Sequence, residues 1–524
     1  MKAINRKTKR SFGIMTVMSI ILTIIVFVMV TLAACTRASG RVQSFSSKRL
    51  TNGGLHIGWA MGDITPEGPV SLCGQYYKRI SKFVQSPLKV TAFAIESTNA
   101  DGSKEQAIMV SMDLLNIGRY MQDSLRAIVK KQIPDFDKKK LFLNATHTHS
   151  APDPDLKEYR NLILKRVGEA IISAWNNRKP AGISSEIGYA VVGHNRRVQY
   201  SNGTTEMYGL TDREDFIGME GGNNPGVGML FCWDMDKKLT GIVMNVSCPA
   251  QVTEAKYYVS SDYWGEVRKQ IGKRFSDDVY VLPQCGAAGD LSPRDLPHGY
   301  KSGEPNMWNL PGIVEIGERL IHTIDVAYPH ALESIQTKVV FNHLVKDIDL
   351  PTRRVTEKEY EEALKIANEI HSREPKDPNF PNTAWNRFLN EIRDNEKVKD
   401  FGPWDNKNSD FGIVKEEEAL VEKYKNQDKN PLFRVELHVI RLGDIAFATN
   451  PFELYTDFGF RIMGRSKAKQ TFLVQLSSGN YGDYLPTERA IKGGGYSAKV
   501  TIVGPEGGKM LVDETVKLIY EMLE

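Results

Sequence analysis

The chain has 524 residues, of which 41% are hydrophobic, and its 68 basic and 64 acidic residues leave a formal net charge of +4. This composition can bury a large core, which excludes an intrinsically disordered protein. The charge imbalance is too small to indicate a nucleic-acid-binding protein, and the sequence contains no DNA- or RNA-binding motif.

The first 35 residues have the pattern of an export signal. Basic residues precede an uncharged apolar run, Gly13–Ala34, which ends directly at Cys35. Residues 32–35 resemble the lipobox of bacterial lipoproteins, where cleavage before the cysteine leaves a lipid-modified N-terminus. The run is also long enough to remain as a membrane-spanning helix. With either outcome we expect an exported protein of the bacterial cell envelope, held at a membrane surface by a tether over residues 36–54.

Strand and helix patterns alternate from Leu55 onward. The strand-like runs VTAFAIES, QAIMVSMDLL and KLFLNATH surround the helical pattern MQDSLRAIVKKQI, and TGIVMNVSC and VYVLPQC flank the helical DYWGEVRKQIGKRF. This alternation predicts a mixed α/β fold of packed layers over residues 55–524. The four cysteines after Cys35 are too few for a disulfide-built scaffold and are expected to be buried thiols.

The composition changes over residues 352–430. Thr356 and Glu359 form a capping-box pattern, and apolar residues at 360, 363, 364, 367 and 370 predict an amphipathic helix. The rest of the stretch is charged and rich in Pro and Asn, so we expect an exposed helical insertion without a chemical role. The strand-like runs VELHVIRLGDIAFATN and QTFLVQLS then resume the domain.

Two motifs follow strand-like runs in the first half of the domain. His147 and His149 stand two residues apart at the end of KLFLNATH, so on an extended chain they share a face and can be aimed at one metal ion or one substrate. They can equally satisfy neighbouring carbonyl groups. Asp290 and Ser292 lie in the loop after VYVLPQC, where the serine can act as a nucleophile or the pair can form an ordinary turn.

Two further motifs follow strand-like runs near the C-terminus. Glu453 precedes an amphipathic helix, where its carboxylate can cap the helix or bind a metal, and capping is the more frequent role. The loop after QTFLVQLS carries Asn480, Tyr481, Asp483 and Tyr484, and tyrosines in such loops are usually packing residues. Strand ends are where α/β folds collect their functional sites.

Taken in order, these segments resemble the neutral/alkaline ceramidase family, whose members are zinc amidohydrolases of N-acyl sphingosine. The matching segments are HIGWAMGDITPEG, NATHTHSAPD, GHNRRV, SSDYWGEV, GAAGDLSPR, NPFELYTDFG and SGNYGDYLPTERA. The resemblance covers most of residues 55–510, and the histidine motif is its most specific part. It implies a ceramidase-like catalytic domain.

The resemblance also implies roles for individual residues. His147, Glu453 and Tyr484 match zinc ligands of the family, and Arg196 matches an arginine that contacts the acyl or carboxylate end of the substrate. Such a metal polarises the amide carbonyl and activates a water molecule. The resemblance further gives catalytic roles, in handling protons and the developing oxyanion, to Ser292 and His149.

The sequence departs from the family at its second histidine ligand. The corresponding segment reads NVSCPAQVTE and contains no histidine. Cys248 stands at or next to the missing ligand, so either its thiolate binds the zinc or it is a buried apolar residue and the metal is lost or held by three groups. Gln251 and Glu254 are weaker replacements.

A second departure concerns the C-terminus, where the chain ends in the helical LVDETVKLIYEMLE. We therefore expect no C-terminal immunoglobulin-like domain of the kind that active ceramidases of the family carry, and the resemblance supports amide hydrolysis more strongly than it supports ceramide as the substrate. The leading hypothesis is an exported, membrane-tethered, zinc-dependent amidohydrolase of a ceramide-like lipid. The alternatives are a hydrolase of another ester or amide on the same fold and a non-catalytic surface lipoprotein.

Overall fold

The computed structural model describes residues 53–75, 79–98, 102–298, 307–372, 410–477, 479 and 481–524. The predicted export signal, nearly all of the predicted tether, most of the Pro- and Asn-rich part of the insertion and Asn480 lie outside these ranges. None of the helices within them combines the length and the apolar composition that crossing a bilayer requires.

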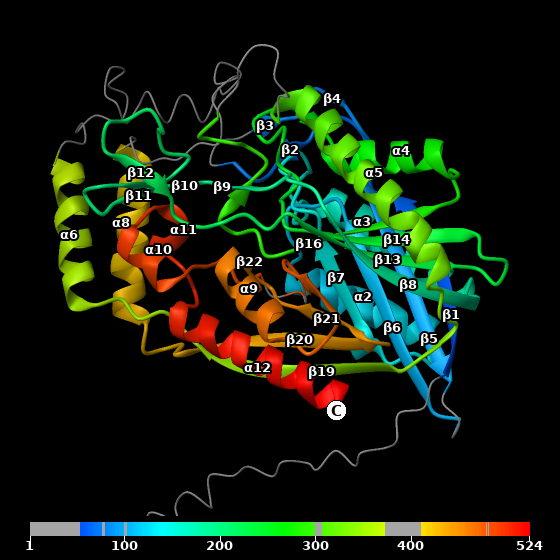
Figure 1. The fold of residues 1–524 in the computed structure, drawn as a ribbon. Helices are drawn as coiled ribbons and strands as arrows, with labels where there is room; N and C mark the ends of the chain where they lie inside the picture. Colours follow the sequence, from blue (N-terminus) through cyan, green and yellow to red (C-terminus); the bar gives the residue numbers. More distant parts are fainter. Residues whose placement is uncertain are drawn as a thin grey trace, which may run out of the picture. The chain divides into compact units, whose positions relative to one another are not determined.

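A large mixed sheet forms the centre of the described chain (Figure 1). Neighbouring strands are antiparallel except at the two edges, where β14 pairs with β16 and β6 pairs with β7 in parallel. Its strands, in spatial order, are β16 (Tyr280–Cys285), β14 (Leu239–Val246), β13 (Gly226–Trp233), β8 (Lys179–Tyr189), β1 (Gly53–Asp63), β5 (Lys89–Thr98), β6 (Lys104–Met112) and β7 (Leu141–Ala145), with β18 (Lys338–Val339) paired to β1.

Both faces of this sheet are buried, which explains its nearly continuous apolar strands. In β5, Ala92 and Ala94 face one core cluster, whereas Phe93 and Ile95 face another. The second cluster also contains Phe447 from a smaller sheet, so the two sheets pack face to face. The smaller sheet consists of β19 (Phe341–Pro351), β20 (Leu432–Leu442), β21 (Ile445–Thr449) and β23 (Gln470–Val474).

Helices cover the outer face of each sheet. The large sheet is covered by α2 (Arg119–Gln132), α3 (Lys157–Asn176), α4 (Tyr263–Arg274) and α5 (Asn309–Glu333). The smaller sheet is covered by α9 (Thr456–Arg465) and α12 (Pro505–Leu523), and Figure 1 shows α12 running along β19 and β20. The order helix, sheet, sheet, helix confirms the predicted mixed α/β layers.

Short elements connect these layers. They are β2 (Ser71–Leu72), β3 (Arg79–Ile80), β4 (Phe83–Val84), η1 (Lys138–Lys140), β9 (His194–Asn195), β10 (Arg197–Tyr200), β11 (Thr205–Met207), β12 (Phe216–Met219), β15 (Tyr258–Val259), β17 (Leu291–Ser292), β22 (Glu453–Leu454), β24 (Tyr484–Leu485), α10 (Glu488–Gly493) and α11 (Tyr496–Lys499). Among them, β17 pairs with β9 and β22 pairs with β24. These two strand pairs carry the candidate site residues Ser292, Glu453 and Tyr484.

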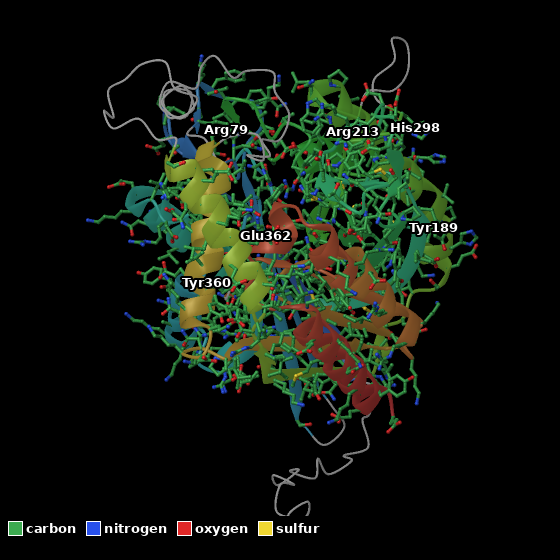
Figure 2. All side chains as sticks on the ribbon, turned by 90° about the vertical axis from the view of Figure 1, so that its left-hand side faces the viewer. Arg79, Tyr189, Arg213, His298, Tyr360 and Glu362 are labelled. Carbon is green, nitrogen blue, oxygen red and sulfur yellow. The ribbon has the colours of Figure 1, made fainter. Side chains whose placement is uncertain are left out.

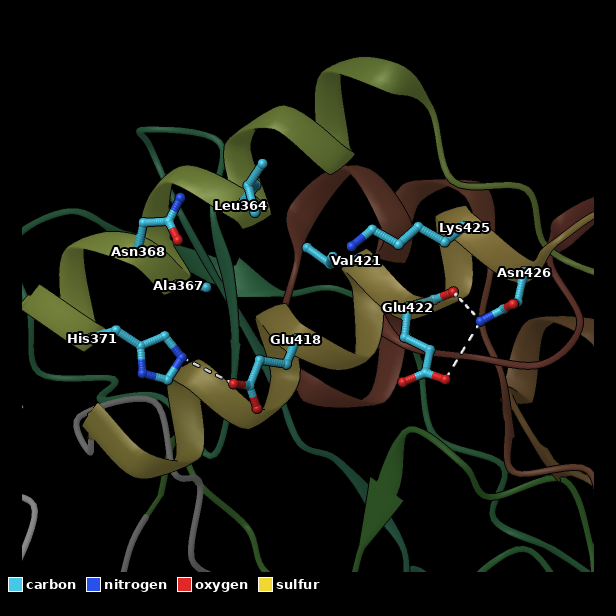
Figure 3. A pocket seen from close by; sticks show the side chains of 9 residues that line it. All are labelled: Leu364, Ala367, Asn368, His371, Glu418, Val421, Glu422, Lys425 and Asn426. Atoms are coloured by element: carbon cyan, nitrogen blue, oxygen red, sulfur yellow. Dashed lines mark hydrogen bonds and ion pairs between the residues drawn. The ribbon is translucent and has the colours of Figure 1, made fainter.

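The helices α6 (Glu357–Ser372) and α8 (Asp410–Asn426) of the 352–430 stretch pack against each other and face the viewer in Figure 2. The capping box forms as predicted, since Thr356 Oγ1 accepts from the Glu359 amide at 3.2 Å and Glu359 Oε2 accepts from the Thr356 amide at 2.8 Å. Between the helices lies a groove of about 440 Å³ (Figure 3). It is lined by Leu364, Ala367, Asn368, His371, Glu418, Val421, Glu422, Lys425 and Asn426.

The ends of three strands meet at one place. Asn144 Nδ2 in β7 donates to the Pro283 carbonyl in β16 at 3.0 Å. The Gln475 amide, one residue after β23, donates to the Cys285 carbonyl at 3.0 Å, and the Ala145 amide donates to Leu476 at 3.4 Å. The loops that follow β7, β16 and β23 therefore start side by side, and these are the loops that carry the sequence motifs.

Candidate active site

His147 lies directly after β7 and is buried. Its φ of 62° is in the left-handed region, a backbone conformation that costs a non-glycine residue roughly 1–3 kcal/mol. Nδ1 lies 2.8 Å from the Leu115 carbonyl oxygen, and because a carbonyl only accepts, Nδ1 must carry a proton. Nε2 is left to face the site, where it lies 3.4 Å from Glu453 Oε2.

Glu453 reaches His147 from a distant part of the chain. It lies in β22, whose parallel partner β24 places Tyr484 opposite it, and its Oε1 accepts from the Tyr481 hydroxyl at 2.7 Å. Burial on its own would raise the pKa of Glu453, but His147 beside it lowers that pKa to about 2. The carboxylate is thus held in its charged form next to the imidazole.

Helix α9 is capped by Asp290 rather than by Glu453. Asp290 Oδ1 accepts from the amide of Thr456 at 2.8 Å and from its hydroxyl at 2.6 Å, at the first residue of the helix. Asp290 Oδ2 accepts from Asn195 at 3.0 Å. Of the two roles that the sequence left open for Glu453, the cap is thus supplied by the loop after β16, and Glu453 faces His147.

His149 lies beside His147, with their Nε2 atoms 3.3 Å apart, and its Nδ1 is 3.5 Å from Glu254 Oε2. Burial, and then the neighbouring His147, lower the pKa of His149 well below its usual range, so the ring is neutral. Gly74 packs against this ring with a φ of 94°, and a Cβ there would lie 2.7 Å from His149 Cγ. Glycine is required at that position on both grounds.

Arg196 is a fully buried cation on the other side of the site. Its Nη1 donates to the Tyr208 hydroxyl at 2.8 Å, and its Nη2 donates to the Tyr484 hydroxyl at 3.2 Å and to the Gly289 carbonyl at 2.9 Å. Burial opposes its charge, but the neighbouring tyrosines and Glu453 raise the pKa of Arg196 well above its usual value. The guanidinium is therefore a fixed positive charge facing Tyr484.

Ser292 is buried in β17. Its Oγ accepts from the Arg294 amide at 3.0 Å, as expected for a simple turn, and its hydroxyl also hydrogen-bonds to the phenol of Tyr208. Among the hydrogen bonds of the described residues none joins Ser292 to His149. The structure thus links Ser292 to Arg196 through Tyr208. The catalytic role of Ser292 stays a prediction.

Cys248 is buried but does not join this group. Its Sγ donates to the Val192 carbonyl at 3.3 Å and lies 3.6 Å from the Pro249 carbonyl. Burial, and then the neighbouring Cys285, raise the pKa of the Cys248 thiol well above its usual value. No described contact joins its sulfur to His147 or Glu453, and its role as a zinc ligand stays a prediction.

The donor atoms fit part of a zinc site. Two ligands that bind a tetrahedral zinc at about 2.0–2.1 Å are about 3.4 Å apart, which is the separation of His147 Nε2 and Glu453 Oε2. The bond from His147 Nδ1 to Leu115 orients the ring as the outer partners of metal-binding histidines do. No group of three or more His, Cys, Asp and Glu side chains in the described ranges is arranged to hold a metal, so His147 and Glu453 form a pair, with the Tyr484 phenol opposite Glu453.

Several buried polar atoms around these residues have no hydrogen-bond partner. They are His149 Nδ1, Arg196 Nε, Gln251 Oε1 and Glu254 Oε1. Each unpaired buried group costs about 1–3 kcal/mol, and native proteins keep few of them. Their concentration beside His147 and Glu453 indicates a place that a ligand, an ion or water completes.

Sequence reasoning missed Tyr208, which links Arg196, Ser292 and Gln251. Gln251 Nε2 donates to its hydroxyl at 2.7 Å, and burial raises the pKa of Tyr208 to about 12. Tyr208 lies one residue after β11, in a loop without a recognisable motif. Its φ of 52°, which only the structure shows, is the feature that marks it.

Comparisons with known proteins support the fold. No protein-family model matches the sequence, and no curated protein sequence matches it. Among solved structures, the chain is similar to neutral ceramidase from Pseudomonas aeruginosa, with a TM-score of 0.62 and 19% identity over 90% of this chain and 75% of that one. A structure described as ceramidase complexed with C2 matches with a TM-score of 0.60 and 17% identity over 90% of this chain and 76% of that one. The chain has the ceramidase fold, which confirms the resemblance at the level of structure.

Proposed function

We propose that the protein is an amidohydrolase that cleaves the N-acyl amide of a ceramide-like lipid at the site around His147 and Glu453. The observation that carries the proposal is the pair itself, because strand ends from opposite parts of the chain bring an oriented imidazole and a charged carboxylate to 3.4 Å. The ceramidase fold supports the reaction class by analogy. The unpaired polar atoms beside the pair support a binding site there.

We also propose that the site holds zinc. His147 and Glu453 would hold the ion, with the phenol of Tyr484 as a further ligand. A zinc bound there would polarise the amide carbonyl and lower the pKa of a water molecule.

The protein groups around the pair have the chemistry that amide cleavage needs. Arg196 holds a fixed positive charge beside Tyr484, where it stabilises negative charge on the carbonyl oxygen of the substrate. His149 Nε2 lies 3.3 Å from His147 Nε2, which places its ring where it can hydrogen-bond to the attacking water. The hydroxyls of Ser292 and Tyr208 lie together and can orient the carbonyl group.

The N-terminal segment suits a lipid substrate. An apolar run followed by a lipobox-like cysteine would hold the exported domain at the membrane where ceramide-like lipids reside. We therefore propose a location in the cell envelope, on a membrane surface.

A substrate panel tests the proposal. The full-length protein in detergent micelles would be given N-acyl sphingosines of several chain lengths, the matched O-acyl esters and N-acyl amino acids, and free fatty acid would be measured by mass spectrometry. We expect release from the N-acyl sphingosines that a chelator abolishes and zinc restores. Cleavage of the esters alone, or of no N-acyl sphingosine, contradicts the proposal.

A second candidate is a surface lipoprotein that binds lipid without cleaving it. The contact of the Cys248 thiol with the Val192 carbonyl favours it, since no described contact joins this sulfur to His147 or Glu453 in place of the family histidine. Saturable binding of N-acyl sphingosine by protein that carries stoichiometric zinc yet releases no fatty acid would establish this candidate.

A further inference from the structure

Glu254 is a buried carboxylic acid that the chemistry described so far leaves unused. Its side chain is 1% exposed, and Oε2 accepts from Gln75 Nε2 at 3.2 Å while lying 3.5 Å from His149 Nδ1. The other oxygen, Oε1, has no hydrogen-bond partner. A carboxyl group buried with one oxygen unpaired is costly, so a purely structural role explains only the half that faces Gln75.

The loop that carries Glu254 is fixed to the loop that carries His149. Asp262 accepts from the amides of Val252 at 3.2 Å and Thr253 at 3.0 Å, which holds the residues just before Glu254. Arg79 Nη1 donates to the Lys256 carbonyl at 3.0 Å, and its Nη2 donates to the His149 carbonyl at 2.6 Å. One guanidinium therefore sets the position of Glu254 relative to His149, as a preorganised site requires.

Amide hydrolysis needs a proton donor that an ester with a good leaving group does not need. The C–N bond breaks only when the nitrogen receives a proton, and the donor must carry that proton at neutral pH. Burial raises the pKa of Glu254 to about 8, although nearby arginines act in the opposite direction. The titratable and charged groups that face Glu254 are His149, Arg79, Arg196, Arg294 and Asp262.

We propose that Glu254 donates the proton that the leaving amine takes up, an inference that rests on the proposed amidohydrolase function. As the C–N bond breaks, its electron pair stays on the nitrogen, which takes the proton from the Glu254 carboxyl. The attacking water forms the new C–O bond and gives up a proton, which replaces the one that Glu254 donated. One water is consumed, one fatty acid and one amine are released, and Glu254 ends in its starting form.

The substitution Glu254→Gln tests this role, because it keeps the size and the bond to Gln75 and removes the acidic proton. We expect kcat/KM for an N-acyl amide to fall about 10²-fold. For the p-nitrophenyl ester of the same fatty acid, whose leaving group departs without a proton, we expect a change below about threefold. A residue that only supports the structure would lower both rates together.

A matched control is Glu436→Gln, which makes the same change in a partly buried carboxylate outside the site. Glu436 pairs with Arg126 and His438 and touches none of the residues around His147. Rates measured per folded molecule should match the wild type for both substrates.

Two kinetic outcomes overturn the inference: equal losses of kcat/KM for the amide and the ester, or an unchanged kcat/KM for the amide. A third is less bound zinc in Glu254→Gln than in the wild type, because Glu254 would then be a zinc ligand. A wild type that cleaves no amide contradicts the proposed function instead. The infrared difference spectrum between wild type and Glu254→Gln separates these cases without turnover. A protonated-carboxyl band at neutral pH supports the proton donor, and its absence contradicts it.

Discussion

Two clusters of buried histidine and glutamate side chains can be compared in this protein. In the first, where β20 and β19 pair, His343 Nε2 lies 3.0 Å from His438 Nδ1, and His438 Nε2 lies 3.0 Å from Glu436 Oε1. His343 Nδ1 lies 3.1 Å from the Gln106 carbonyl, and Arg126 donates to both oxygens of Glu436 at 2.9 and 2.7 Å. Every polar side-chain atom of these two histidines and this glutamate has a partner, and only Nε of the neighbouring Arg126 lacks one.

The second cluster is built from the same residue types and is incomplete. Around His147, the separations are 3.3 Å to His149 and 3.4 Å to Glu453, and Glu254 Oε1 has no hydrogen-bond partner. The two clusters share residue types, but the Glu436 side chain is 21% exposed, whereas those of Glu453 and Glu254 are 5% and 1% exposed. The comparison teaches that deep burial of carboxyl groups together with an unpaired oxygen, rather than the histidines themselves, distinguishes the proposed site.

The largest expected difference between the clusters is in the response to losing a carboxylate charge. Glu453→Gln should lower kcat/KM about 10³-fold, because it removes a fixed charge at the reacting centre. Bound zinc per chain should fall at the same time, as measured by elemental analysis. The matched variant Glu436→Gln should leave both quantities unchanged, and wild-type values in Glu453→Gln would remove the proposed site.

Breaking the first cluster should instead cost stability. His438→Ala leaves His343 Nε2 without its partner, takes one of the two donors from Glu436 Oε1 and opens a cavity, so we expect the free energy of unfolding to fall by about 3 kcal/mol. Urea denaturation measures this change, and kcat/KM per folded molecule should stay the same. A loss of activity without a loss of stability would reverse the roles assigned to the two clusters.

The first cluster should also give the stability a specific dependence on pH. Burial would raise the pKa of Glu436, but His438 and Arg126 lower it to about 2 from an ordinary 4.5. Because this pKa is lower in the folded protein than in the unfolded chain, Glu436 adds stability above pH 4.5. That contribution to the free energy of unfolding, roughly 3 kcal/mol for this shift, is lost as the pH falls through 2. The free energy of unfolding of Glu436→Gln should lack this part of the acid loss, and parallel curves for the two proteins would contradict the prediction.

The smallest effect is expected at Cys248. Cys248→Ala removes one buried sulfur that bonds only weakly to backbone carbonyls, so we expect about 1 kcal/mol of lost stability. Zinc content and activity should not change, because the sulfur contacts the Val192 and Pro249 carbonyls and no described contact joins it to His147. A drop in zinc content would show that the thiol replaces the missing histidine after all.

Local patterns were enough to predict many of the elements. The continuous apolar run of β5 and the capping box before α6 depend on neighbours in the sequence, and both form as predicted. The meeting of His147 with Glu453 depends on contacts between distant strands, such as the bond from Asn144 to Pro283. Periodicity does not contain that information, and only the resemblance to a known family indicated it.

Other features had no signal in the sequence. Glu254 faces His149 because Asp262 and Arg79 fix its loop, and those bonds cannot be read from residue spacing. The direction of the Cys248 thiol is likewise set by packing against Val192. His438 sits inside an ordinary strand pattern, so its buried cluster appeared only in the structure.

The most direct test compares the two clusters in one assay. Free fatty acid released from N-acyl sphingosine would be measured for the wild type, His147→Ala and His438→Ala, each corrected for its folded fraction. The account predicts release by the wild type and His438→Ala and none by His147→Ala. Equal release by His147→Ala and the wild type, or no release by any of the three, would contradict it.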